Sequence, residues 1–133
     1  MPAPANDSGF EAYRKSVEKE IEKHNKTLQK EPANAEAHFQ LGLAYQALGR
    51  HEEEIAEYKE TIRIKPDYAD AHFNLAMSYD LLGDGANSIR HMILARQIYF
   101  AQRNHGKIRA SQRLLRGFYD KYGYDPEDFI RSK

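Results

Sequence analysis

The chain repeats part of its own sequence with a period of 34 residues. Ala35-Glu36-Ala37-His38-Phe39 returns as Ala69-Asp70-Ala71-His72-Phe73. The same offset relates Leu41/Leu75, Tyr45/Tyr79, Leu48/Leu82, Gly49/Gly83, Ile55/Ile89 and Ile64/Ile98. Self-similarity at periods of roughly 20 to 50 residues is typical of stacked-repeat proteins, in which one unit cannot bury its apolar face without a neighbour. The pattern predicts an inter-helix core made of Leu41, Tyr45, Ile55, Tyr58, Leu75, Tyr79 and Ile89.

The repeated residues resemble the tetratricopeptide repeat. Leu41-Gly42, Tyr45, Tyr58 and Pro66 match its pattern, with His38 in the first aromatic slot. The second copy departs from the pattern at Ala76, Ser88, Met92 and Phe100, which replace the Gly, the later Ala, the second aromatic residue and the Pro. The resemblance, to small prokaryotic-like members, implies an all-α fold: a right-handed helical-repeat stack of about six helices, with two full repeats plus flanking helices.

Domain organisation follows from the period and from local start and stop signals. We expect a disordered N-terminus at residues 1–7, a repeat domain at 8–122 and a short tail at 123–133. Within the domain we expect a lone helix 8–30, repeats 35–68 and 69–102, and a C-terminal helix 107–122. Gly49 and Gly83 end the first helix of each repeat. Asn104-His105-Gly106 predicts the break before the last helix, and a continuous helix over 85–122 is the alternative.

The resemblance also implies a concave groove lined by the first helix of each repeat. The groove slots hold Glu36, Phe39, Leu43, Gln46, Ala47, Asp70, Phe73, Asn74, Met77, Asp80 and Leu81. Several slots that are commonly polar in the family are apolar here, which indicates an interaction site if the strip is exposed. The chain's own last helix or tail could equally cover it. Phe39 and Leu43 stand where a carboxylate clamp for chaperone tails needs Lys and Asn, so that function is disfavoured, although Asn74 occupies a clamp position.

Charge is distributed unevenly along a chain whose formal net charge is zero. Residues 1–60 carry −4, residues 61–89 carry −2 and residues 90–133 carry +6. No acid occurs from Arg90 to Arg116. We predict a basic surface at Arg96, Arg103, Lys107, Arg109, Arg113 and Arg116, which attracts an anionic partner or is simply a solvated helix face.

No motif for catalysis or cofactor binding is recognisable, so we expect a non-enzymatic protein without a cofactor. His38 and His72 share one repeat slot about 10 Å apart, too far to bind one metal ion, and we interpret them as packed rings. Glu54 replaces the usual Ala between the two helices of a repeat; we expect its carboxylate to reach water, or alternatively to pair a partner's cation. The absence of Cys, of a basic-then-apolar leader and of an apolar run long enough for a membrane span predicts a cytoplasmic location.

The favoured function is that of a protein-interaction module, an adaptor or scaffold that binds an apolar or amphipathic peptide of unknown identity in the concave groove. The alternative is a structural self-assembly unit whose copies stack or pair through oppositely charged ends, giving a homo-oligomer. Nucleic-acid binding is a third, less favoured hypothesis.

Overall fold

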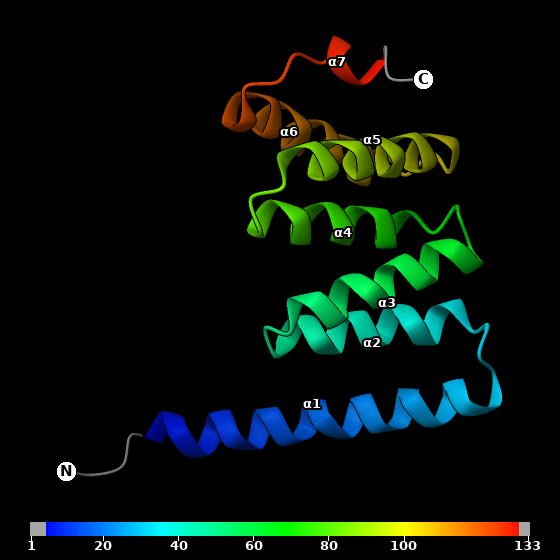
Figure 1. The fold of residues 1–133 in the computed structure, drawn as a ribbon, viewed down its shortest axis with the longest axis vertical. Coiled ribbons are helices and arrows are strands. Elements are labelled where there is room, and N and C mark those ends of the chain that lie inside the picture. Colours follow the sequence, from blue (N-terminus) through cyan, green and yellow to red (C-terminus); the bar gives the residue numbers. More distant parts are fainter. Residues whose placement is uncertain (1–4, 131–133) are drawn as a thin grey trace. The chain divides into compact units, whose positions relative to one another are not determined.

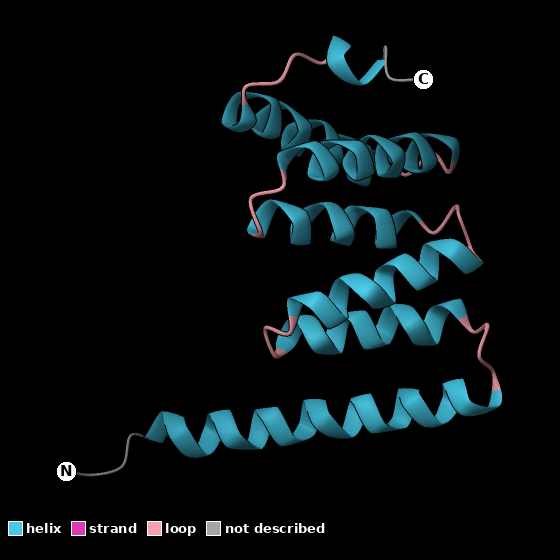
Figure 2. Ribbon diagram, in the orientation of Figure 1, coloured by secondary structure: helices cyan, strands magenta, loops and turns pink. Residues whose placement is uncertain are grey.

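The computed structural model describes the backbone of residues 5–130 and the side chains of residues 8–130, and every regular element in that part is a helix (Figures 1 and 2). The helices are α1 (Ala5–Lys30), α2 (Ala35–Ala47), α3 (His51–Ile64), α4 (Ala69–Leu81), α5 (Gly85–Ala101), α6 (His105–Tyr122) and α7 (Glu127–Ile130). The all-α fold and the two helical pairs are therefore as the sequence predicts.

The chain divides into two compact units, Met1–Ile64 and Lys65–Lys133. In unit 1, α2 packs against both α1 and α3. In unit 2, α5 packs against both α4 and α6, and the short α7 lies beside them (Figure 1). The core of unit 2 contains Ala69, Ala76, Ile89, Met92, Ala95, Tyr99, Leu115 and Phe118.

The residues that share the 34-residue period occupy the interior of each unit. Leu41, Tyr58, Leu75 and Ile89 are at most 1% exposed, and Ile55 is 9% exposed. The two equivalent tyrosines, Tyr45 and Tyr79, are only partly buried. The period therefore identifies the core, and its Tyr slot lies at the edge of it.

A close approach of α2 and α3 explains why the first repeat has Gly42. A Cβ atom at Gly42 would lie 2.4 Å from Cε1 of the buried Tyr58 ring. In the second repeat Ala76 replaces the glycine and Met92 replaces the tyrosine, and both are fully buried. The flexible methionine leaves room for the extra methyl group, so the two departures from the repeat pattern compensate each other.

The boundary between α5 and α6 corrects the predicted break at Asn104-His105-Gly106. The turn is centred on Arg103, which has a φ of 57°, and Gly106 lies inside the first turn of α6. Asn104 caps α6 because its side-chain oxygen accepts a hydrogen bond from the Lys107 amide, 3.2 Å away. The continuous helix over 85–122 is wrong. The boundary is set by the capping side chain of Asn104 and not by Gly106.

The first helix also begins earlier than predicted. α1 starts at Ala5, so residues 5–7 are helical where the sequence suggested disorder, and residues 1–4 lie outside the described residues. Alanine favours the helix more than any other residue, which is consistent with the earlier start. With 26 residues against 13 in α2, α1 extends well past its neighbour within unit 1 (Figure 1).

Candidate functional site

The groove slots of unit 1 are largely used by the unit itself. Phe39 is 8% exposed and packs on Tyr58 at a ring-centroid distance of 5.7 Å. Leu43 is partly buried in a hollow between α1 and α2, while Glu36 and Gln46 are exposed. Phe39 is thus an interior residue, and the expectation that it offers an exposed apolar surface needs correction.

The groove slots of unit 2 are more accessible, although α5 and α6 contact several of them. Phe73 is partly buried, its ring meets that of Tyr99 edge-on at 6.3 Å, and the Lys107 ammonium lies 4.6 Å from the Phe73 ring centroid. Met77 is partly buried against the unit 2 core. Leu81, in contrast, is 65% exposed. Apolar surface therefore remains along α4.

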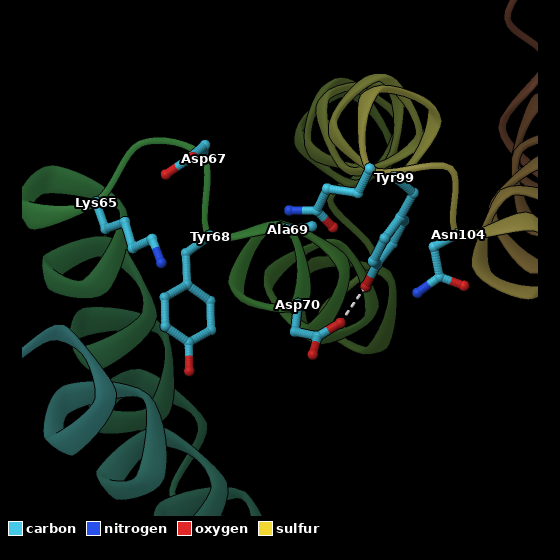
Figure 3. Close-up of a pocket in the computed structure, with 8 residues that line it drawn as sticks. Lys65, Asp67, Tyr68, Ala69, Asp70, Tyr99 and Asn104 are labelled. Carbon is cyan, nitrogen blue, oxygen red and sulfur yellow. Dashed lines mark hydrogen bonds between the residues drawn. The ribbon is translucent and has the colours of Figure 1, made fainter.

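Asp70 lies at the start of α4, in a polar hollow that Figure 3 shows in close-up. The Tyr99 hydroxyl of α5 donates a hydrogen bond to Oδ1 of Asp70, and the Lys65 ammonium lies 5.7 Å from the ring centroid of Tyr68. Burial raises the pKa of Tyr99, and the bond to Asp70 raises it further. Tyr99 therefore remains a neutral donor that fixes one edge of the predicted groove.

Asp80, near the end of α4, is bound by the last helix. Its Oδ1 accepts hydrogen bonds from the Lys121 ammonium at 2.9 Å and from the Tyr122 hydroxyl at 2.7 Å. Burial opposes ionisation of Asp80, but these two donors outweigh burial and lower its pKa. The ring of Tyr122 also fills the space beside Gly85, where a Cβ atom would lie 2.3 Å from the ring. α6 therefore contacts α4 at Asp80, while the neighbouring Leu81 remains exposed.

Each of the equivalent histidines contacts the second helix of its own repeat and a proline in the segment that precedes the repeat. His38 places Nδ1 2.7 Å from Oε1 of Glu57 and donates from Nε2 to the Pro32 carbonyl oxygen. His72 likewise donates from Nε2 to the Pro66 carbonyl oxygen and places Nδ1 3.2 Å from Nδ1 of His91. Burial lowers the pKa of His72. Among residues 8–130, no group of three or more side chains is placed to hold a metal ion.

Glu54 corrects another expectation. It is fully buried, and its Oε1 lies 2.8 Å from Nδ1 of His51, one turn earlier on α3. A carboxylate can occupy this slot because a local partner is available, so it does not need to reach water. Glu54 is therefore closed to a partner's cation. Its counterpart Ser88 instead donates a hydrogen bond across the helical pair to the Ala76 carbonyl oxygen, 2.7 Å away.

The predicted basic residues differ in what they contact. Lys107 faces Phe73, and Arg96 is partly buried near Tyr119. Arg103, Arg109, Arg113 and Arg116 are exposed. Among the described residues, none of these five arginines forms an ion pair, whereas Arg14, Arg50 and Arg63 of unit 1 each pair with a glutamate three or four residues away. The contrast arises because α5 and most of α6 contain no acid.

Sequence reasoning missed the residues that bind the two acidic side chains of α4 from outside the groove slots. Tyr99, Lys121 and Tyr122 do this in unit 2, and none belongs to a groove slot. Their only sequence signals are the loss of Pro at Phe100 and the apolar stripe of the last helix. Neither signal predicts which α4 residue is contacted.

In the described part of the chain, no helix is both long and apolar enough to cross a lipid bilayer.

Comparison with known families and structures agrees with the helical-repeat fold. The family model described as TPR repeat matches residues 45–83, and the one described as tetratricopeptide repeat matches residues 25–56. No curated protein has a sequence that matches the chain.

Among solved structures, PcrH in complex with the chaperone binding region of PopD has a TM-score of 0.77 and 18% sequence identity, covering 88% of this chain and 90% of that chain. The translocator chaperone SycD of Yersinia enterocolitica type III secretion has a TM-score of 0.76 and 15% identity, covering 89% and 83%. The TPR2B domain of yeast Sti1, in its pHsp70 complex, has a TM-score of 0.73 and 18% identity, covering 85% and 91%. At these identities the likeness concerns the fold.

Proposed function

Because this chain is a tetratricopeptide-repeat protein, we propose that it is a non-enzymatic protein-interaction module that binds an apolar or amphipathic peptide through its groove-lining helices. The observation that carries the proposal is the face of α4. It carries Phe73, Met77 and the exposed Leu81 at helical spacing, with the acidic side chains Asp70 and Asp80 near its two ends. An apolar stripe with polar ends suits a peptide that has apolar side chains and polar flanks.

Two of the similar structures support the proposal, since each contains a segment of another protein. PcrH was solved with the chaperone binding region of PopD, and SycD has also been solved with a peptide of the translocator YopD. Repeat scaffolds present many unrelated ligands on one fold, so these segments do not identify the partner of this chain.

Selection from a phage-displayed library of random peptides tests the proposal. We expect the wild-type chain to enrich peptides with spaced apolar residues. Met77→Glu should abolish that enrichment because it places a charge in the stripe. Tyr13→Glu is the matched control, since Tyr13 is 53% exposed and lies on α1, outside the groove slots. Enrichment that survives Met77→Glu in a folded variant would remove α4 as the binding face.

Self-assembly is the second candidate, favoured by the arginines without ion pairs in unit 2 and by an acidic excess in unit 1. The exposed aromatic rings of Phe10 and Tyr13 on α1 add apolar surface for such a contact.

A further inference from the structure

A second surface of unit 2, away from the groove slots, has the properties of a docking site. It lies along the α5–α6 pair and consists of Ile93, Leu94, Gln97, Phe100, Ile108 and Gln112, which we call the α5–α6 face. Phe100 is 72% exposed and Leu94 is 40% exposed, high values for large apolar side chains. This face therefore leaves apolar area in contact with water.

Two hollows lie along this face and meet at Gln97. One, of about 220 Å³, is lined by Phe100, Ile108 and Gln112 with Arg96. The other, of about 270 Å³, is lined by Ile93 and Leu94 with Arg90 and the ring of Phe129. From Arg90 to Phe100 the helix spans about 15 Å, the length of nearly three turns of a partner helix.

The chain's own tail occupies one end of the face. The ring of Phe129 on α7 lies 6.1 Å from the ring of Tyr119, and the Arg90 guanidinium lies 5.8 Å from the Phe129 ring centroid. Phe129 is partly buried against the unit 2 core, whereas the next residue, Ile130, is 68% exposed. One aromatic side chain thus anchors a helix of only four residues.

The sequence of this tail shows what the face accepts. Asp125-Pro126-Glu127-Asp128 precedes the anchor, so three acids lie beside a phenylalanine. The face itself is flanked by cations: Arg90 and Arg96 belong to a stretch without acids, and Arg96 has no ion pair among the described residues. Charge and shape therefore favour the same ligand, an acidic helix with an aromatic anchor.

We propose that the α5–α6 face is a docking site for an acidic amphipathic helix of a partner protein, and that α7 is a resident mimic which such a helix displaces. A partner of about three turns covers both hollows, whereas α7 reaches only the Arg90 end. Displacement is feasible because the resident helix is only four residues long. The site is independent of the groove on α4, so either proposal can fail without the other.

The probe is a fluorescein-labelled peptide with the sequence of residues 124–130, measured by fluorescence anisotropy against the full-length chain. We expect Phe129→Ala to bind it at least tenfold more tightly than the wild type, because the intramolecular competitor has lost its anchor. Asp125→Ala combined with Asp128→Ala is a second release variant. It removes the carboxylates that accept hydrogen bonds from the Glu127 and Asp125 amides, without altering α5 or α6.

Matched changes separate the proposal from its alternatives. In the Phe129→Ala chain, Arg90→Glu should weaken peptide binding at least fivefold, while Lys19→Glu on α1 makes the same charge change and should have no effect. A peptide with Ala in place of its Phe should bind at least tenfold more weakly.

Four results would overturn the proposal. The first is equal affinity in the wild type and both release variants, and the second is equal affinity for the anchorless peptide. The third is tighter binding of a seven-nucleotide single-stranded DNA than of the peptide, which would make the face a nucleic-acid site. The fourth is a wild-type dimer that Phe129→Ala converts to a monomer, which would assign the face to the tail of a second copy. Circular dichroism melting verifies that each variant is folded.

Discussion

Single residues explain why the two repeats differ from each other. Gly42 and Tyr58 of the first repeat correspond to Ala76 and Met92 of the second. The two differences occur together because the small residue on one helix faces the large one on the other. The substitution of Glu54 by Ser88 changes a local bond to His51 into a bond across the helical pair. Each repeat is therefore internally consistent, and exchanging one residue between repeats should be harmful.

Gly42→Ala tests this consistency. The new Cβ would overlap the Tyr58 ring, so we expect the free energy of unfolding to fall by about 1–3 kcal/mol, as for other overpacked cores. Adding Tyr58→Met should restore most of the loss. Gly117→Ala on α6 is the control, since a Cβ there would meet no atom within 4 Å beyond the adjacent backbone of its own helix, and it should be neutral or stabilising. Urea denaturation measures the free energy of unfolding of all three variants. Additive effects at positions 42 and 58 would show that the two residues do not compensate each other.

His72 should make stability depend on pH. Burial lowers its pKa in the folded state, so below the unfolded value of about 6.5 the unfolded chain binds a proton that the folded chain does not. Stability is therefore fully present above that pH and is lost as pH falls toward the folded pKa, by up to about 1.4 kcal/mol per pH unit. The urea concentration at the midpoint of unfolding should decrease as the pH is lowered from 7.5 to 5.5, and His72→Phe should make this decrease smaller. An equal decrease in both proteins would exclude His72.

At the scale of helices, the sequence predicted most of the order and several of the boundaries. Residues that recur at the period, such as Leu41 and Leu75, determine which helices pair, and Gly49 and Gly83 determine where the first helix of each pair ends. The α5–α6 turn was misplaced because its left-handed residue is Arg103, which no glycine rule identifies. The contacts that α6 makes with Asp80 and Phe73 also escaped prediction, because they fall outside the period.

Arg103→Gly should stabilise the α5–α6 turn. A left-handed conformation costs a non-glycine residue about 1–2 kcal/mol, and glycine removes this cost. Glycine also loses more conformational entropy on folding, which opposes the gain by about 0.5–1 kcal/mol. We expect a net gain of about 0.5 kcal/mol, seen as a higher melting temperature. Gly83→Ala, at a φ of 78°, should have the opposite effect. A lower melting temperature for Arg103→Gly would mean that the arginine side chain stabilises the turn through contacts of its own.

At the scale of the molecule, the two units differ in how their charged side chains are paired. The arginines of unit 1 are paired with nearby glutamates, while the six arginines of unit 2 from Arg90 to Arg116 have no ion pair among the described residues. Unpaired cations attract an anion over roughly one Debye length, about 8 Å at 0.15 M salt. Both the α5–α6 face and self-assembly rely on this attraction, so salt should weaken either of them, and oligomeric state distinguishes the two.

If copies assemble through opposite charges, the mass measured by light scattering should exceed that of a monomer in low salt and fall to it as salt rises past about 0.15 M. Arg109→Glu together with Arg113→Glu should give a monomer at every salt concentration. Both side chains are exposed and neither has an ion pair among the described residues, so folding should be unaffected. Lys15→Glu together with Lys19→Glu changes net charge equally on α1 and should leave assembly intact. A wild-type chain that is monomeric even at low salt would exclude self-assembly. The ligand of the unit 2 arginines would then be a different, acidic protein.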